Sequence, residues 1–141
     1  MLLFFLQKLL SVRTIYVRVN DGKWRHICVS WDNADGQWAF FKDGVVVDSK
    51  SGYKQGYVIL PGGTLVLGQS QLGVKTFDPN HLFEGEMANF NLWSHYLTAI
   101  EVSRMSNSCV NGRGDVFRWS RFRHHRINGK VQVVTPSACA P

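Results

Sequence analysis

The sequence predicts an all-β fold, a two-sheet antiparallel sandwich or jelly roll with one short helix. Three observations support this prediction. Seven or eight short segments are rich in β-branched and aromatic residues, turns containing glycine, asparagine or aspartate separate them, and one segment carries a helix-start pattern. The chain has 141 residues and no linker-like stretch divides it, so we expect one domain with a sizeable core.

Alternation and turn chemistry define the individual strands. Between residues 26 and 31, two faces are expected: Ile27, Val29 and Trp31 on one, and His26, Cys28 and Ser30 on the other. An Asp-Gly pair at 43–44 separates two apolar runs, which is a strong hairpin signal. The expected strands cover residues 13–20, 26–31, 38–41, 45–47, 64–68, 83–93, 116–119 and 131–134.

One helix and one long loop complete the expected fold. Thr98 and Glu101 have the spacing of a capping box, in which each side chain bonds the backbone N–H of the other residue. The helix should be short and end near Met105. Residues 69–81 are polar, lack apolar periodicity and are predicted to form a loop, and loops of this length are often functional.

A short motif in the second expected strand suggests a family. The run His26-Ile27-Cys28-Val29-Ser30-Trp31 matches the pentraxin signature His-x-Cys-x-Ser/Thr-Trp. The family's further motifs follow in order: Phe41-Lys42-Asp43-Gly44, Leu67-Gly68-Gln69, Phe83-Glu84-Gly85 through Phe90-Asn91-Leu92-Trp93, a Leu-Thr-x-x-Glu helix start, and Gly114-Asp115-Val116 to Trp119. Over residues 13 to 135 the chain therefore resembles the pentraxin family, including the pentraxin-like domains of adhesion receptors and mosaic extracellular proteins.

This resemblance implies a two-sheet jelly roll of the concanavalin and laminin-G kind, in which Trp31 fills core between the sheets. The family's first strands have no counterpart here, so the resemblance implies an N-terminally truncated domain over residues 13–141. Residues 1–12 are expected to be a ragged or non-native segment. The apolar run near the start is too short to span a membrane and makes a poor signal peptide, although a buried strand and a degenerate signal sequence remain alternatives.

The chain has three cysteines, an odd number that suggests a missing partner or a free thiol. In the family, the signature cysteine pairs with a cysteine on an earlier strand. No cysteine precedes Cys28 here, so this thiol is expected to be unpaired. The resemblance implies a Cys109–Cys139 disulfide, because the family places those two segments close together. The alternative is that all three cysteines are free.

The resemblance also implies a calcium site in the 69–81 segment, through which the family binds phosphocholine, phosphoethanolamine or carbohydrate. The matching ligand positions are Ser70, Gln71, Asp78 and His81. Calcium prefers several hard oxygen ligands, mostly carboxylates and carbonyls. Two of the family's acids are replaced here, by Ser70 and by Leu72, so calcium binding is expected to be weak or lost.

Positive charge is concentrated towards the C-terminus, between Arg118 and Arg126, in a chain of net charge +6. Such a run favours polyanions, although a solvated strand face is the simpler interpretation. If the run is a strand, Arg121, Arg123 and His125 share one face, while Arg118 and Arg126 point the other way. The extracellular resemblance favours a glycosaminoglycan, a phospholipid head group or a protein as partner, and not nucleic acid.

The tripeptide Arg113-Gly114-Asp115 has the integrin-type sequence, but a Gly-Asp start of a strand explains two of its three residues.

Enzymatic chemistry has little support in the sequence. Glu84 and Glu86 would share a strand face and resemble the paired acids of jelly-roll glycosidases, while phosphate-loop, zinc and nucleophile-elbow motifs are absent from the sequence. His26 is expected to be a hydrogen-bonded structural histidine.

The sequence thus predicts a non-enzymatic recognition or adhesion module, secreted or part of a larger extracellular protein. An oligomer is possible by family resemblance, and no segment is long enough to cross a membrane. Two alternatives remain: a jelly-roll lectin or glycan-active enzyme, and a truncated fragment without a function of its own.

Overall fold

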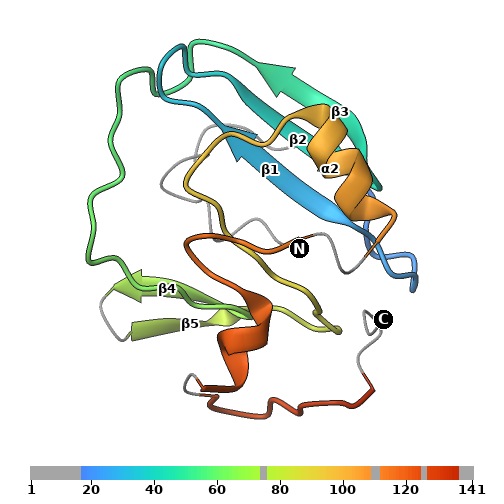
Figure 1. Cartoon of the computed structure of the whole chain (residues 1–141). Helices are drawn as coiled ribbons and strands as arrows, with labels where there is room; N and C mark the ends of the chain where they lie inside the picture. Colours follow the sequence, from blue (N-terminus) through green and yellow to red (C-terminus); the bar gives the residue numbers. More distant parts are fainter. Residues whose placement is uncertain (1–16, 74–75, 109–111, 125–126, 137–141) are drawn as a thin grey trace.

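The computed structural model describes residues 17–73, 76–108, 112–124 and 127–136. Within this part of the chain, five strands form two antiparallel sheets, accompanied by an α-helix and a 3-10 helix. The α-helix lies over the larger sheet, and the smaller sheet and the 3-10 helix lie at the other end of the molecule (Figure 1). The antiparallel sheets and the short helix confirm the predicted all-β fold class.

The larger sheet contains β1 (Ile27–Trp31), β2 (Trp38–Lys42) and β3 (Val45–Lys50), in that spatial order. The smaller sheet pairs β4 (Gln69–Gly73) with β5 (Thr76–Leu82). The strands predicted over 26–31, 38–41 and 45–47 are therefore confirmed. Their order along the chain equals their order in the sheet, so short turns suffice to connect them.

The turn between β2 and β3 confirms the predicted Asp-Gly hairpin. Asp43 and Gly44 both have positive φ, 51° and 80°, as a two-residue type I′ turn requires. Gly44 also lies against the α-helix, where an added Cβ would come 3.1 Å from the Cβ of Ser106 and 3.2 Å from the Cα of Ser103. Position 44 thus needs glycine both for backbone conformation and for close packing.

The hydrophobic core lies between the larger sheet and the α-helix. Ala39 and Phe41 on β2 contact Leu97 and Val102, and Cys28, Trp93 and Met105 pack against this cluster. Strand alternation therefore turns the face of β1 that carries Cys28 and Ser30 towards the helix. Trp38 and Phe40, on the opposite face of β2, are buried as well.

Helix α2 (Ala99–Ser106) begins where the sequence predicts. The Thr98 hydroxyl accepts a hydrogen bond from the Glu101 backbone N–H at 3.3 Å, and the Glu101 carboxylate accepts one from the Thr98 N–H at 2.8 Å. This reciprocal capping box fixes the start of the helix, so that Val102 enters the core with its side chain fully buried.

Other strand predictions are wrong. Residues 69–81, predicted to be a loop, contain β4 and most of β5, while residues 64–68, 83–93 and 131–134 form no regular strand. Residues 17–20 are irregular too, and the rest of the expected 13–20 strand lies outside the described residues. The expected strand at 116–119 is reduced to one bridge between Phe117 and Leu92, followed by the 3-10 helix η2 (Trp119–His124). These apolar runs lack a paired ladder, which a strand requires in addition to a suitable composition.

Candidate functional site

The signature residues run along β1, and His26 at its start is hydrogen-bonded to Asp43 of the β2–β3 turn. The His26 N–H donates to Asp43 Oδ1 at 3.1 Å, and the Asp43 N–H donates to the His26 carbonyl at 2.8 Å. The ring atom Nδ1 of His26 is buried and has no hydrogen-bond partner among the described residues. Burial lowers the pKa of His26, and the nearby Asp43 carboxylate opposes that shift. His26 is thus bonded to the turn through its backbone N–H and carbonyl and not through Nδ1.

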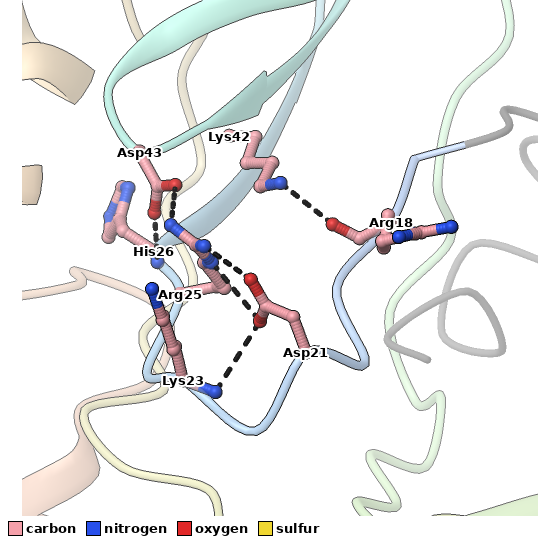
Figure 2. A network of polar contacts seen from close by, with 7 residues as sticks. All are labelled: Arg18, Asp21, Lys23, Arg25, His26, Lys42 and Asp43. Atoms are coloured by element: carbon pink, nitrogen blue, oxygen red, sulfur yellow. Dashed lines mark hydrogen bonds and ion pairs between the residues drawn. The ribbon is translucent and has the colours of Figure 1, made fainter.

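Arg25 ties the same turn to the segment before β1 (Figure 2). Its Nη1 donates to Asp43 Oδ2 at 3.0 Å, its Nε donates to Asp21 Oδ1 at 3.3 Å, and its Nη2 forms an ion pair with Asp21 Oδ2. The hydrogen bond from Arg25 lowers the pKa of Asp21 to about 2. The two carboxylates thus engage the partly exposed Arg25 guanidinium, which leaves it fewer donors for a ligand.

Cys28 and Ser30 face the core. Burial raises the pKa of the Cys28 thiol to about 12, and Cys28 forms no disulfide within the described residues. The Ser30 hydroxyl is also buried, and it accepts a hydrogen bond from the Leu97 N–H at 2.7 Å. Cys109 and Cys139 lie outside the described residues, so their predicted disulfide stays a prediction.

Trp31 ends β1 and contacts the segment that follows β3. Its indole Nε1 donates to the Tyr53 carbonyl at 3.0 Å, and its ring lies 6.4 Å from the ring of Tyr57. Trp31 lies on the face of β1 opposite to the cluster around Phe41 and is half-buried. The four signature residues therefore each support the fold by a different contact.

The predicted calcium positions come together on the β4–β5 hairpin. Ser70 and Gln71 lie on β4, and Asp78 and His81 lie on β5. Asp78 accepts the Asn80 N–H with its Oδ1 at 2.9 Å, and its carbonyl accepts a bond from the Gln69 side chain at 3.3 Å. Ser70 is buried. The carboxylate of Asp78 thus already supports the hairpin that holds it.

This donor set does not fit calcium well. Calcium takes six to eight oxygen ligands, and tight sites supply several carboxylates. The four positions provide one carboxylate. Across the described ranges, no group of three or more His, Cys, Asp or Glu residues is placed to hold a metal ion. That this hairpin binds calcium weakly or not at all stays a prediction.

The Arg-Gly-Asp segment serves the fold. The Gly114 N–H donates to Asn91 Oδ1 at 3.3 Å, and an added Cβ at Gly114 would come 2.7 Å from the Leu92 nitrogen. Asp115 accepts two hydrogen bonds from Ser94, which lower its pKa to about 2. Gly114 and Asp115 are thus engaged within the fold, although no regular strand begins there, and Arg113 is exposed.

The basic segment is not the strand that was expected. Residues 119–124 form η2, and the Arg121 N–H donates to the Arg118 carbonyl at 3.0 Å, which closes a 3-10 turn. Side chains three residues apart lie on the same side of such a turn. Arg121 therefore shares a side with Arg118, which the predicted strand would place on the opposite face. His125 lies outside the described residues.

Sequence reasoning missed two residues here. Arg118 was assigned to the opposite face because a period of two was assumed in place of three. Asn91 was not considered, yet its Oδ1 lies 3.4 Å from the Trp119 nitrogen as well as accepting from Gly114. The Asn-x-Trp spacing at 91–93 offered no signal for this role. Asn91 connects the Gly114 segment to the start of η2.

The two acids Glu84 and Glu86 are not arranged as expected. Glu84 and Glu86 lie in irregular chain and are both exposed, so the strand face they were expected to share does not exist. The glycosidase resemblance that rested on that face is lost.

None of the described helices is long and apolar enough to cross a membrane.

Comparison with known proteins agrees with the motifs. A sequence model of the Pentaxin family matches residues 7–136. Human neuronal pentraxin-2 is 40% identical over 102 residues, covering 72% of this chain and 24% of the relative. Human neuronal pentraxin-1 is 40% identical over 124 residues, covering 86% of this chain and 28% of the relative. The rat "Sushi, von Willebrand factor type A, EGF and pentraxin domain-containing protein 1" is 38% identical over 122 residues, 84% of this chain and 3% of the relative.

The chain thus spans about a quarter or less of the length of these relatives. Among solved structures, an S-layer domain-containing protein of Clostridium thermocellum has a TM-score of 0.50 at 18% identity, covering 64% of this chain and 42% of its own. That likeness concerns the fold alone. Because the family match extends over nearly the whole chain, the protein belongs to the Pentaxin family.

Proposed function

We propose that this chain is an extracellular recognition module of pentraxin type that binds a glycosaminoglycan through surface contacts, without depending on calcium. The observation that carries the proposal is the contrast between two regions. The β4–β5 hairpin offers one carboxylate, Asp78, to a cation. Residues 116–141 contain five Lys and Arg residues and neither Asp nor Glu, so they can attract an anionic polymer directly.

An extracellular location is part of the proposal. Its support is the family membership and the relatives named neuronal pentraxin and pentraxin domain-containing protein. We further propose binding and not turnover, because the only paired acids singled out in the sequence, Glu84 and Glu86, are exposed on irregular chain without a shared face. Glycoside hydrolysis by paired acids requires two carboxyl groups held at a defined separation.

Affinity chromatography tests the proposal. The chain is applied to immobilised heparin and to immobilised phosphoethanolamine, each in calcium and in EDTA. We expect retention on heparin in both buffers and elution by salt, because cationic side chains bind polyanions by releasing condensed counterions. Retention on phosphoethanolamine that EDTA abolishes would favour a working calcium site instead. Absence of retention on heparin would contradict the proposal, and an uncharged agarose column controls for adsorption to the resin.

A further inference from the structure

We infer that Arg118 and Arg121 form a paired guanidinium contact for a sulfated polysaccharide, with the η2 turn as its rigid support. This inference rests on the proposed function and goes further by assigning the contact to two residues. The 3-10 hydrogen bond from the Arg121 N–H to the Arg118 carbonyl is 3.0 Å long. In this geometry the two side chains project on one side, separated by roughly 6 Å along the helix axis.

A hydrogen bond to the backbone holds the Arg118 side chain in place. Its Nε donates to the Gly114 carbonyl at 2.9 Å, and Gly114 is itself buried and bonded to Asn91. One of five guanidinium donors is thereby used. The terminal nitrogens have no partner among the described residues, and those of Arg121 likewise have none. Each arginine thus keeps the planar fork that binds sulfate or carboxylate oxygens in pairs.

Aromatic packing makes the turn a firm support. The rings of Trp119 and Phe122 stack with centroids 5.1 Å apart and planes 25° apart. Phe122 meets Phe117 edge-on at 5.9 Å, and Phe117 in turn contacts Phe90 at 5.9 Å. Because the backbone of η2 is anchored by these rings, less conformational entropy is lost when a ligand binds its two arginines.

The local positive charge favours an anionic partner, and the spacing of the two arginines favours a polymer. No acidic residue follows Asp115 in the sequence, and the Asp115 carboxylate is occupied by Ser94. A small anion would reach one guanidinium at a time, whereas a chain carrying repeated anionic groups can contact both. Arg121 and Arg118 are both exposed, so an extended polymer has access to them. Sulfate groups match the fork of arginine better than the point charge of lysine.

The experiment measures the salt concentration that elutes the whole chain from heparin. The variants are Arg118→Ser, Arg121→Ser and the double change. The matched control is Lys23→Ser plus Lys50→Ser, which removes the same charge from exposed positions outside residues 116–141. We expect each arginine change to reduce the slope of log affinity against log salt by about 1. The control should reduce the slope by clearly less.

Conservative variants separate a binding role from a structural one. Arg121→Lys keeps the charge but loses the fork, and should recover only part of the retention lost in Arg121→Ser. Arg118→Lys also loses the bond to Gly114 and should recover less. Near-ultraviolet circular dichroism, to which the Trp119–Phe122 stack contributes among the other aromatic side chains, should stay unchanged in both arginine-to-lysine variants.

The outcomes separate a failure of the assigned arginine pair from a failure of the proposed function. If the unmodified chain is not retained on heparin, the proposed function fails. If it is retained and the control lowers retention as much as the arginine changes do, binding is a diffuse charge effect and the assigned pair is wrong. Desulfated heparin and anionic phospholipid vesicles serve as alternative ligands. Equal binding to either would overturn the assignment to a sulfated polysaccharide.

Discussion

Ser94 donates two hydrogen bonds to the carboxylate of Asp115, from its backbone N–H at 2.8 Å and from its hydroxyl at 2.6 Å. The pair joins the segment before α2 to the segment before η2, which are 21 residues apart. His95 lies beside it, with Nδ1 3.6 Å from Asp115 Oδ2. The aspartate of the Arg-Gly-Asp tripeptide therefore links two irregular segments through hydrogen bonds.

The first prediction concerns this link. Asp115→Ala should lower the thermal midpoint, because Ser94 loses both of its acceptors, whereas Arg113→Ala, an exposed change in the same tripeptide, should leave the midpoint unchanged. The folded pKa of Asp115, about 2, lies below the usual value of 3.8, so its stabilising effect is present above pH 3.8 and is lost as the pH falls towards 2. Equal midpoints for the two variants would contradict this role.

A second prediction concerns Ser30. Ser30→Ala leaves the buried N–H of Leu97 without its acceptor and should cost about 1–3 kcal/mol of unfolding free energy. Urea denaturation measures the loss. Ser49→Ala, at an exposed position of β3, is the control and should change stability little. A loss below the error of the urea midpoint would show that the Ser30–Leu97 bond does not contribute.

The third prediction is a pH dependence from His26. Burial lowers its folded pKa below the unfolded value of 6.5, so the unfolded chain binds the proton more readily. Stability should therefore be full above pH 6.5 and decrease as the pH falls below it. The Asp43 carboxylate opposes the shift, and Asp43→Asn should steepen the decrease. Urea midpoints at several pH values between 5 and 8 provide the measurement. A His26→Gln variant that keeps the same pH dependence would assign the effect to another group.

Cysteine labelling is the fourth test. With its pKa raised to about 12, Cys28 should react with a thiol reagent far more slowly than a model thiol, and react fully once the chain is unfolded. Under oxidising conditions, peptide mapping is expected to show Cys109 bridged to Cys139 and Cys28 alone labelled after unfolding without reduction. A bridge that includes Cys28 would disprove this pairing.

The fifth prediction is that calcium binds weakly at the β4–β5 hairpin. Isothermal titration should give a dissociation constant weaker than the sensor range, about 10⁻⁵ M. The reason is the donor set, in which Ser70 and Leu72 stand at positions where acids are expected. Asp78→Asn should abolish whatever affinity is present. Tight binding would mean that the ligand positions were assigned to the wrong residues.

The features that the sequence predicted well are those set by local chemistry. Asp43 and Gly44 had to adopt positive φ for any tight hairpin, and Thr98 with Glu101 had to cap any helix begun there. Both are properties of two to four adjacent residues. The alternation in β1 was equally visible, because one of its faces contributes to the core.

Errors arose where two periods fitted one segment or where no period was present. In residues 117–119, aromatic and basic side chains alternate, which suggests a strand, yet Trp119 and Phe122 are also three apart, as a 3-10 turn requires. The turn prevails because it lets those two rings stack. The β4–β5 hairpin contains few apolar residues, so backbone pairing holds it together without a hydrophobic pattern to reveal it.

The Ser30–Leu97 hydrogen bond closes a separation of 67 residues. A chain emerging from the ribosome can pair β1, β2 and β3 through their short turns, but the helix face of that sheet stays uncovered until Leu97 and Val102 have been synthesised. During that interval Ala39 and Phe41 are exposed to other nascent chains. Completion of the core is thus governed by a late, long-range closure, which gives slow folding and a time window in which a chaperone would matter.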